Sequence, residues 1–588
     1  MRIVAQSTET TDWVSRFADE VIEESERRAP GAKHSGAAAP VVVVASGLSP
    51  SGPIHLGNLR EVMTPHLVAD EIRRRGYTVR HLISWDDYDR YRKVPAGVAG
   101  VDESWAEHIG KPLTSVPAPK GSEYPNWAEH FKAAMTAALA ELGVEYDGIS
   151  QTEQYTAGTY REQVLFAMKH RGDIDAILDQ YRTKKAPAKK QQGQKPVDEA
   201  ELEAAEGSGA AAEDDGSSAS GYYPYKPYCG QCDKDLTTVT AYDEETTELT
   251  YTCSACGFSE TVRLSEFNRG KLVWKVDWPM RWAYEGVVFE PSGVDHSSPG
   301  SSFQVGGQIV GLFGGKQPIG PMYAFVGISG MAKMSSSKGG VPTPADALQI
   351  MEPQLLRWLY ARRRPNQSFK IAFDQEIQRL YDEWDKLAGK VTDGSVLPAD
   401  AAAYTRAIGT AAGELPPTPR PMAYRTLASV ADITAGAEDQ TLRILSELDP
   451  ENPLASLDEV RPRLDKAETW INTQVPAEER TVVRDEPDVE LLKSLDDQGR
   501  ESLRLLLDGL EANWSLDGLT HLVYGVPKVQ AGFPADATAK ELPAEIKVAQ
   551  RTFFALLYHL LVGRDTGPRL PTLLLAVGQD RVRKLLAA

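Results

Sequence analysis

The sequence predicts an α/β nucleotide-binding fold that carries a cysteine-bearing insert and ends in an all-helical domain. Three observations support this fold class: a strand, loop, helix and strand pattern begins at residue 41, all four cysteines lie between residues 222 and 263, and helical periodicity dominates beyond residue 372. Strand–helix–strand units of this kind open parallel, doubly wound sheets. With 588 residues, of which 41% are hydrophobic, the chain is long enough for several buried cores.

Composition excludes several classes of protein. No stretch approaches the ~18 consecutive apolar residues of a membrane span, and the N-terminus lacks a basic region followed by an apolar core, so we expect neither an integral membrane protein nor secretion. Four cysteines are too few for a disulfide scaffold in a chain of this length. The net charge of -19 argues against coating nucleic acid through bulk charge, although it leaves room for a local basic groove. We therefore expect a soluble, cytoplasmic enzyme.

The first βαβ unit is inferred from the periodicity of apolar residues. Four consecutive valines at 41–44 indicate a buried strand, and a loop rich in Ser, Gly and Pro follows at 46–53. The next segment repeats apolar residues at helical spacing up to Gly76, and residues 77–85 predict a second strand. We expect residues 41–182 to form the first half of a Rossmann-type domain, preceded by an N-terminal extension at 1–40.

The remaining domain boundaries follow changes in composition. Residues 183–221 turn to Lys, Gln and Pro and then to Ala, Glu, Gly and Ser without apolar periodicity, which predicts a disordered linker. Residues 222–263 are compact, aromatic and rich in Thr, which predicts a folded insert. Residues 264–372 predict the second half of the α/β domain, and residues 373–588 predict the helical domain.

The insert contains two C-x2-C pairs separated by 20 residues. Two such turns bring four thiolates into a tetrahedron, which suits zinc, and a closed four-sulfur site is structural. A redox role for one pair would leave the other unexplained. The sequence therefore predicts one structural zinc ion, held by Cys229, Cys232, Cys253 and Cys256.

The loop after the first strand carries a motif suited to an anion, residues 53–58 (PIHLGN). An imidazole and an amide at the start of a helix lie beside exposed backbone N–H groups, and His55 is placed to donate to an attacked phosphate. A lone histidine at a strand–helix turn can equally be structural. A second motif, residues 331–340 (MAKMSSSKGG), adds two lysines on a Ser/Gly-rich loop, and such cations stabilise a leaving pyrophosphate.

Together the two motifs resemble the signature motifs of class I aminoacyl-tRNA synthetases. Residues 55–58 are similar to HIGH with Asn58 in place of the second His, and residues 333–337 are similar to KMSKS with Ser336 in place of the second Lys. The resemblance is closest to the class I lysyl-tRNA synthetases, in which both departures occur. Three further stretches carry it, at residues 85–95, 277–282 and 289–296, and it covers residues 41–372.

The resemblance implies a two-step reaction. Lysine attacks the α-phosphate of ATP, which is accompanied by Mg²⁺, and the adenylate is then attacked by the terminal adenosine of tRNA(Lys). The helical domain is implied to bind the anticodon. Catalytic roles are implied for His55, Asn58, Lys333 and Lys338. ATP contacts are implied for Pro53, His55, Gly57, Asn58, Lys333, Met334, Ser335 and Ser336.

A pocket for lysine needs aromatic walls for its stem and an acidic or carbonyl acceptor for its ammonium group. Residues 271–290 offer three tryptophans and several acids. By motif position the family's pocket points to Gly47, Ser49, Trp274, His296 and Tyr323. Either Asp277 or Asp295 is a candidate acceptor, and the sequence does not choose between them. The acids Asp86, Asp87 and Asp89 are either loop-capping residues, which we favour, or ligands.

Alternative functions remain open at this point. A glutamyl-type class I synthetase would need a basic specificity residue in the pocket. A non-catalytic, zinc-ribbon RNA-binding relative would not need intact ATP loops, and a small HxGH nucleotidyltransferase would explain neither the cysteines nor the helical tail. A tRNA partner requires a local basic surface on this acidic chain. The candidates are Arg73, Arg74, Arg75, Arg357, Arg362, Arg363 and Arg364.

Overall fold

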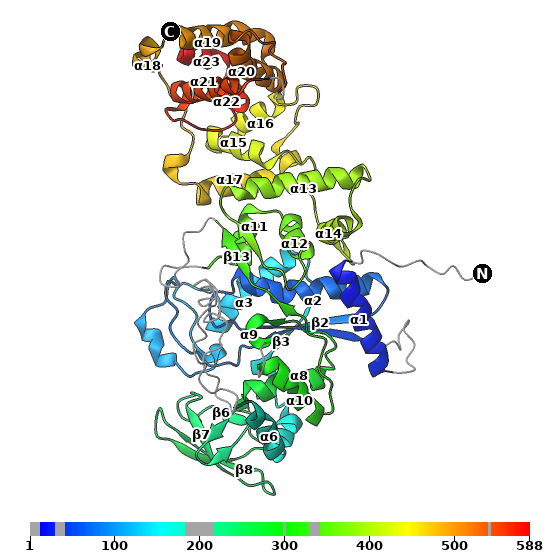
Figure 1. The fold of residues 1–588 in the computed structure, drawn as a ribbon. Helices are drawn as coiled ribbons and strands as arrows, with labels where there is room; N and C mark the ends of the chain where they lie inside the picture. Colours follow the sequence, from blue (N-terminus) through cyan, green and yellow to red (C-terminus); the bar gives the residue numbers. More distant parts are fainter. Residues whose placement is uncertain are drawn as a thin grey trace, which may run out of the picture. The chain divides into compact units, whose positions relative to one another are not determined.

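The computed structural model describes residues 12–29, 41–182, 216–297, 301–329, 341–538 and 542–587. The chain divides into two compact units (Figure 1). Unit 1 comprises residues 1–348, 353–371 and 391–415, and unit 2 comprises residues 349–352, 372–390 and 416–588. This division differs from the predicted boundary at 372/373, because residues 391–415 pack with the α/β unit. None of the helices in the described ranges has the length and apolar content of a membrane span.

The predicted βαβ unit is confirmed and forms the centre of unit 1. Strands β1 (Val42–Leu48), β2 (Val79–Trp85) and β3 (Asp147–Ser150) make a parallel sheet in the order β1-β2-β3, with Val42 opposite Val79. Helix α2 (Leu56–Arg74) makes the crossover from β1 to β2, and α3 (Trp127–Glu141) precedes β3. Strand β1 is buried at six of its seven residues and intermediate only at Gly47, as a central strand of a parallel sheet requires.

The second half of the domain adds to the other edge of β1. The backbone N–H of Ala45 donates to the carbonyl of Phe289 at 2.8 Å, and that of Val288 donates to the carbonyl of Val43 at 2.8 Å. Phe289 in turn bridges to Ile319, again in parallel. The two halves of the chain therefore share one parallel sheet. The carboxyl end of β1 consequently lies beside the residues that follow Phe289.

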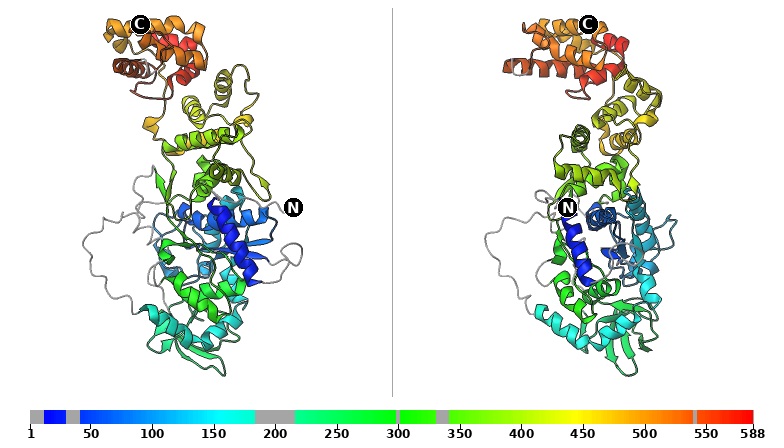
Figure 2. Two further views of the ribbon diagram at one scale, coloured as in Figure 1. Left: turned by 45° about the vertical axis from the view of Figure 1, so that its right-hand side comes forward. Right: turned by 90° about the vertical axis from the view of Figure 1, so that its right-hand side faces the viewer.

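The other elements of the second half surround this junction. Three short strand pairs belong to them: β11 (Ser292–Gly293) with β12 (Met322–Tyr323), in parallel; β13 (Val326–Ser329) with β14 (Phe369–Ala372); and β15 (Gly409–Thr410) with β16 (Gly413–Glu414). The helices are α8 (Trp274–Glu285), α9 (Val294–Ser297), α10 (Ser302–Leu312), α11 (Pro344–Ile350), α12 (Pro353–Ala361) and α14 (Pro398–Ile408). Figure 1 shows α8 and α10 between the parallel sheet and the insert, and the turned views of Figure 2 keep that order.

Helix α1 (Trp13–Arg28) lies within the segment that the sequence predicts as an extension, yet it belongs to the core. Its apolar face is buried, and the indole N–H of Trp13 donates to the carbonyl of Ala361 at 2.8 Å. At its other end Arg28 donates to the carbonyls of Val287 at 2.7 Å and Gln317 at 2.8 Å. The helix thus fastens the second half of the domain to the first.

The insert is built on an antiparallel sheet of β7 (Thr237–Tyr242), β8 (Glu248–Cys253) and β9 (Ser259–Arg263). Strands β6 (Tyr225–Pro227) and β10 (Gly270–Leu272) pair at its base, and α4 (Gln151–Thr156), α5 (Arg161–Lys169) and α6 (Arg171–Arg182) share its core. Strands β4 (Ser217–Ser218) and β5 (Gly221–Tyr222) form a hairpin where the sequence predicts the end of the linker. The rest of that linker, residues 183–215, lies outside the described residues.

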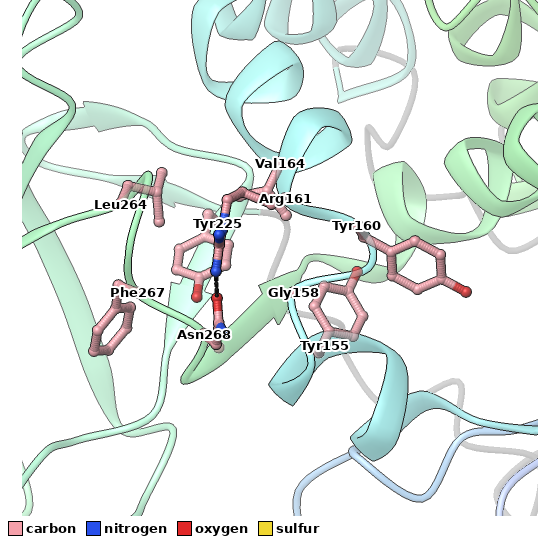
Figure 3. A pocket seen from close by; sticks show the side chains of 10 residues that line it. Tyr155, Gly158, Tyr160, Arg161, Val164, Tyr225, Leu264, Phe267 and Asn268 are labelled. Carbon is pink, nitrogen blue, oxygen red and sulfur yellow. Dashed lines mark hydrogen bonds between the residues drawn. The ribbon is translucent and has the colours of Figure 1, made fainter.

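A small cavity lies where the insert meets α4 and α5 (Figure 3). Tyr155 and Tyr160 line one side, Leu264 and Phe267 line the other, and Arg161 donates to the side chain of Asn268 at 2.7 Å. Its volume of about 10 Å³ is room for roughly one water molecule. The cavity is therefore a packing feature of the junction and not a ligand site.

In unit 2 the described secondary structure is helical, in agreement with the predicted class. One core joins apolar residues from 492 to 586, and a buried ion pair between Arg463 and Glu352, at 2.6 Å, ties the shorter segments together. The helices are α13 (Glu376–Thr392), α15 (Tyr424–Thr434), α16 (Glu438–Glu447), α17 (Arg463–Gln474), α18 (Val489–Ser494), α19 (Asp497–Gly509), α20 (Leu516–Gln530), α21 (Ala544–Val562), α22 (Leu570–Val577) and α23 (Gln579–Leu586).

Arg357 is not part of a basic surface, and its prediction as an RNA contact is wrong. The side chain is fully buried on α12 and donates to the carbonyls of Leu142 at 2.7 Å, Arg406 at 2.7 Å and Gly409 at 3.2 Å. Burial lowers the pKa of the guanidinium to about 10. Arg74 and Arg75 at the end of α2 are also engaged by acids of the chain: Arg74 by Asp70 at 3.1 Å, and Arg75 by Asp19 and Glu71.

We predict that Arg357→Lys destabilises the protein by about 2–5 kcal/mol, because an ammonium group cannot reach all of these carbonyls and each buried acceptor left unpaired costs about 1–3 kcal/mol. Calorimetric unfolding measures the loss. The matched control is Arg263→Lys, whose side chain is half exposed and lies 3.7 Å from Glu266, and it should change stability by less than about 0.5 kcal/mol. Equal effects of the two substitutions would contradict the buried role.

Candidate active site

The N-terminus of α2 is capped by two side chains of the predicted phosphate motif. His55 is the N-cap residue: its Nδ1 accepts a hydrogen bond from the backbone N–H of Gly57 at 3.1 Å, while Asn58 Oδ1 accepts one from the backbone N–H of His55 at 3.3 Å. This reciprocal pairing is a capping box. It leaves the imidazole Nε2 and the amide nitrogen of Asn58 as donors for an anion at the positive end of the helix dipole.

The protonation state of His55 follows from the same geometry. Burial lowers the pKa of His55 below its ordinary value, so the ring is neutral at pH 7. A neutral imidazole whose Nδ1 accepts a hydrogen bond carries its proton on Nε2. The cap also explains why a glycine follows at Gly57, because a Cβ at this position would come within 2.8 Å of the imidazole ring. His55 is thus fixed as an N–H donor aimed away from its own helix.

The chain that follows the second predicted motif returns to this helix end. The backbone N–H of Leu56 donates to the carbonyl of Pro342 at 2.9 Å, and the Tyr360 hydroxyl donates to the carbonyl of Leu56 at 3.1 Å. Pro342 stands two residues beyond the lysine-bearing loop. The loop residues themselves lie outside the described residues, so their roles stay predictions: Lys333, Met334, Ser335, Ser336 and Lys338.

A carboxylate that the sequence analysis did not single out joins two of the predicted lysine ligands. Glu61 Oε1 accepts a hydrogen bond from the backbone N–H of Gly47 at 3.2 Å, and Oε2 accepts one from the hydroxyl of Tyr323 at 3.0 Å. Strand β1, helix α2 and strand β12 therefore converge on one side chain. Helical spacing in the sequence could have identified Glu61. It follows Gly57 by four residues and Asn58 by three, so it lies on the same face of α2 as the phosphate motif.

Glu61 is partly buried and lies beside two further acids. A Cβ on Gly47 would stand 3.6 Å from Glu61 Oε1 and 3.8 Å from Asp86 Oδ2, so these two carboxylates flank the same glycine. Burial, together with the nearby charge of Glu290, raises the pKa of Glu61 to about 8. Within the part of the chain that the structure describes, no Lys or Arg forms an ion pair with Glu61. A partly buried carboxyl group in this setting can receive a cation from outside.

Aromatic rings of α8 and α9 form a wall close to these acids. Trp274 stacks on Trp278 with ring centroids 5.1 Å apart, and His296 lies 6.3 Å from the first ring and 5.9 Å from the second. The indole N–H of Trp274 is buried and has no hydrogen-bond acceptor among the described residues. Trp274 and His296, both predicted from the sequence, are therefore brought together. The wall suits the aliphatic stem and the charge of a lysine side chain.

The geometry does not support the prediction of Asp277 as a ligand of the substrate's ammonium group. Its carboxylate is fully buried, accepts a hydrogen bond from the Tyr155 hydroxyl, and lies 3.2 Å from Arg281 and 3.7 Å from Lys271. Two cations of the chain already neutralise it. Glu61 is the better candidate for the acceptor, and the side chain of Asp295 lies outside the described residues.

The acids that follow β2 are tied into the fold, as the capping interpretation predicts. Asp87 accepts hydrogen bonds from the backbone N–H of Thr152 at 2.8 Å and from Lys132 at 2.5 Å. Asp86 pairs with Arg281 at 2.9 Å, and Asp89 pairs with Lys271 at 2.5 Å. Two other predicted residues, Ser49 and Pro53, are exposed in the loop between β1 and α2.

The four cysteine thiols converge in the insert. Their sulfur atoms all lie within 4.8 Å of one another, with Cys229 and Cys256 3.6 Å apart and Cys232 and Cys253 3.7 Å apart. A tetrahedral zinc ion with bonds of about 2.3 Å requires sulfur–sulfur edges of about 3.8 Å. The residues present therefore fit a closed, four-sulfur zinc site.

Comparison with known proteins gives one consistent result. The family described as "tRNA synthetases class I (K)" matches residues 11–411. A lysine–tRNA ligase from Streptomyces coelicolor is 86% identical over 587 residues, covering 100% of both chains, and one from Thermococcus kodakarensis is 32% identical, covering 92% of this chain and 95% of its own. Among solved structures, a glutamate–tRNA synthetase from Elizabethkingia anophelis is 12% identical and aligns with 93% of this chain and 100% of its own. Its TM-score is 0.40.

Proposed function

This chain belongs to the class I tRNA synthetases of the lysine type, and from that membership we propose that it activates L-lysine with ATP and esterifies tRNA(Lys) with it. The observation that carries the proposal is the 86% identity to a lysine–tRNA ligase along the whole chain. The pocket around Glu61 supports it independently, because it combines a partly buried acid with an aromatic wall. We expect the enzyme to act in the cytoplasm, where its tRNA partner is found.

The chemistry consists of two nucleophilic displacements without a covalent enzyme intermediate. The lysine carboxylate attacks the α-phosphate of ATP, which yields lysyl-adenylate and pyrophosphate. A ribose hydroxyl of the 3′-terminal adenosine of tRNA then attacks the activated carbonyl and releases AMP. Mg²⁺ would accompany ATP and neutralise part of its phosphate charge. The protein's contribution is to position the reactants and to stabilise charge.

The capped end of α2 is proposed to hold the ATP phosphates. His55 donates its Nε2–H and Asn58 donates its amide N–H, while both side chains keep their other atoms in the capping box. Because His55 is neutral, it donates without losing a proton during the reaction. Pro53 and Gly57 shape the loop around the nucleotide. On the second motif Lys333 and Lys338 stabilise the transition-state charge, with Met334, Ser335 and Ser336 contacting ATP.

The pocket around Glu61 is proposed to receive the lysine side chain. Glu61 accepts the ammonium group, and Tyr323 holds the carboxylate in place through its 3.0 Å hydrogen bond. Trp274 and His296 flank the aliphatic stem. Gly47 keeps the space between Glu61 and Asp86 open, because any side chain there would enter it. Ser49, in the adjoining loop, completes the predicted set.

The cysteine cluster is proposed to hold one structural zinc ion. Four protein ligands leave no open position for a substrate, so the ion would stabilise the fold of the insert and take no part in the chemistry. The thiolates hold the ends of two turns, one before β7 and one between β8 and β9. Small sheets of this size need such a crosslink because their own apolar core is limited.

We predict that the Michaelis constant (KM) for lysine depends on pH through Glu61. In the free enzyme burial raises the pKa of Glu61 to about 8, and the bound ammonium group would lower it, so lysine binding requires loss of this proton below pH 8. The affinity should be highest above pH 8 and should fall by up to about tenfold per unit as the pH drops toward 6. Steady-state kinetics measure this profile.

The variant Glu61→Gln provides the control for that profile. It should raise the KM for lysine by about 100-fold and remove the dependence between pH 6 and 8, because the charge and its titration are both lost. The comparison variant Glu153→Gln changes an acid on α4 that lies outside the pocket and should behave as wild type. A pH-dependent KM that survives in Glu61→Gln would refute the assignment.

We predict that His55→Ala, like Lys333→Ala, slows adenylate formation by about 100-fold or more while the protein stays folded. The physical reason is the loss of a donor or cation at the reacting phosphate. Lysine-dependent exchange between ATP and pyrophosphate, run with tRNA(Lys) present, measures the step. His559→Ala, which alters an exposed histidine of unit 2, is the control, and near wild-type exchange in the first two variants would sink the proposed roles.

We predict one zinc ion per chain by elemental analysis, and less than one in Cys232→Ser. Replacement by Co²⁺ should give the visible absorption of a tetrahedral thiolate site. Removal of the metal with a chelator should make residues 222–263 sensitive to protease while unit 2 keeps its thermal transition. Full protease resistance of the insert after metal removal would show that the thiols need no ion.

A further inference from the structure

Glu290 binds two tryptophans of α8 at once. The residue follows Phe289, which bridges to β1, and its side chain is only 5% exposed. Its Oε1 accepts a hydrogen bond from the indole N–H of Trp278 at 3.0 Å, and its Oε2 accepts one from the indole N–H of Trp282 at 2.6 Å. The two tryptophans are four residues apart and share one face of the helix. One carboxylate therefore anchors a full turn of α8.

The anchored turn controls the aromatic wall of the pocket. Trp278 stacks nearly parallel on Trp274, at an interplanar angle of 16°, and its edge meets His296. On the other side Phe303 packs against Trp278 at 5.8 Å. The ring of Trp274 therefore takes its position from Trp278, whose position is in turn set by Glu290. None of the sequence motifs assigns a role to this carboxylate.

Glu290 also acts on Glu61 through its charge. Its proximity is one reason why the pKa of Glu61 is raised, after burial itself. The other groups that face Glu61 are Asp86, which adds negative charge and is paired with Arg281, and the hydroxyl of Tyr323. Within α2, the neighbouring Arg60 donates to the carbonyl of Arg364 at 2.7 Å. Glu290 is thus a second acid behind the proposed ammonium acceptor.

We propose that Glu290 is a positioning residue of the amino-acid pocket, which orients the tryptophan wall of α8 and supplies a second negative charge behind Glu61. The pocket then favours a cationic side chain over a neutral one of the same length. This inference rests on the proposed function, because it assumes that lysine binds at Glu61. Glu290 itself touches the tryptophans and not the reacting atoms.

Two substitutions separate the two contributions. Glu290→Gln keeps the length of the side chain, removes its charge, and sets an amide NH₂ group against one indole N–H. Glu290→Asp keeps the charge but shortens the reach to both indoles. Each should raise the KM for lysine about tenfold or more, since a charge-assisted hydrogen bond is lost, while kcat and the KM for ATP change less than twofold.

The pH profile distinguishes a positioning role from a merely structural one. In Glu290→Gln the inflection in the KM for lysine should move to lower pH than in wild type, because the charge that opposes ionisation of Glu61 is gone. In Glu290→Asp the inflection should stay near pH 8. Near-ultraviolet circular dichroism of the stacked indoles should change in both variants. Should Glu290→Gln not fold, Trp278→Phe, which deletes one N–H donor and keeps a ring, tests the same rise in KM.

The matched control is Glu285→Gln, at the end of the tryptophan-bearing helix α8. Glu285 pairs with Arg80 at 2.8 Å and forms no hydrogen bond to the tryptophans, so the variant should keep the wild-type KM, profile and spectrum. An unchanged KM and inflection in folded Glu290→Gln would overturn the proposal, as would an equal loss of kcat and of the affinities for lysine and ATP. If Glu61→Gln leaves the KM for lysine unchanged, the pocket assignment fails first and independently of Glu290.

Discussion

A partly buried carboxylate that has no cation partner among the described residues is the constraint on which the proposed amino-acid pocket depends. Glu61 in unit 1 is held by a backbone N–H of β1 and by the Tyr323 hydroxyl, with Asp86 and Glu290 close by. Ionising such a group in an apolar interior costs free energy unless a positive charge arrives. In the free enzyme the carboxyl group holds its proton up to about pH 8. We propose that the substrate's ammonium group supplies this charge.

The fold supplies this constraint through its parallel sheet. Strand β1 and the segment around Phe289 run side by side, so Gly47 and Glu290 reach the same edge from opposite halves of the chain. Helix α2 starts at that edge, and its first two turns carry both the proposed phosphate-binding cap and Glu61. In the proposed mechanism the two substrates of the first reaction step therefore meet along one helix. Ligand sites at the carboxyl ends of parallel strands follow the same geometric rule in other α/β proteins.

Much of this arrangement could be predicted from the sequence, for identifiable physical reasons. The valine run, the Gly-rich loop and the cysteine spacing are local patterns, and each specifies its own geometry. Glu61 was missed because its role depends on Gly47 and Tyr323, the latter 262 residues away in the chain. Arg357 was misplaced for a similar reason: its sequence neighbours suggest a basic surface, whereas distant carbonyls bury it. Asp277 looked available until the fold placed Arg281 and Lys271 beside it.

The central claim is that Glu61 loses its proton when lysine binds, because the ammonium group of lysine takes the place of that proton beside the carboxylate. Isothermal titration of the enzyme with lysine at pH 7, in the presence of tRNA(Lys) and in two buffers with different ionisation enthalpies, counts the protons released. The account predicts release of close to one proton per lysine bound, since a group with a pKa near 8 is mostly protonated at pH 7, and no release in Glu61→Gln. Binding of lysine with no proton released by the wild-type enzyme would contradict it.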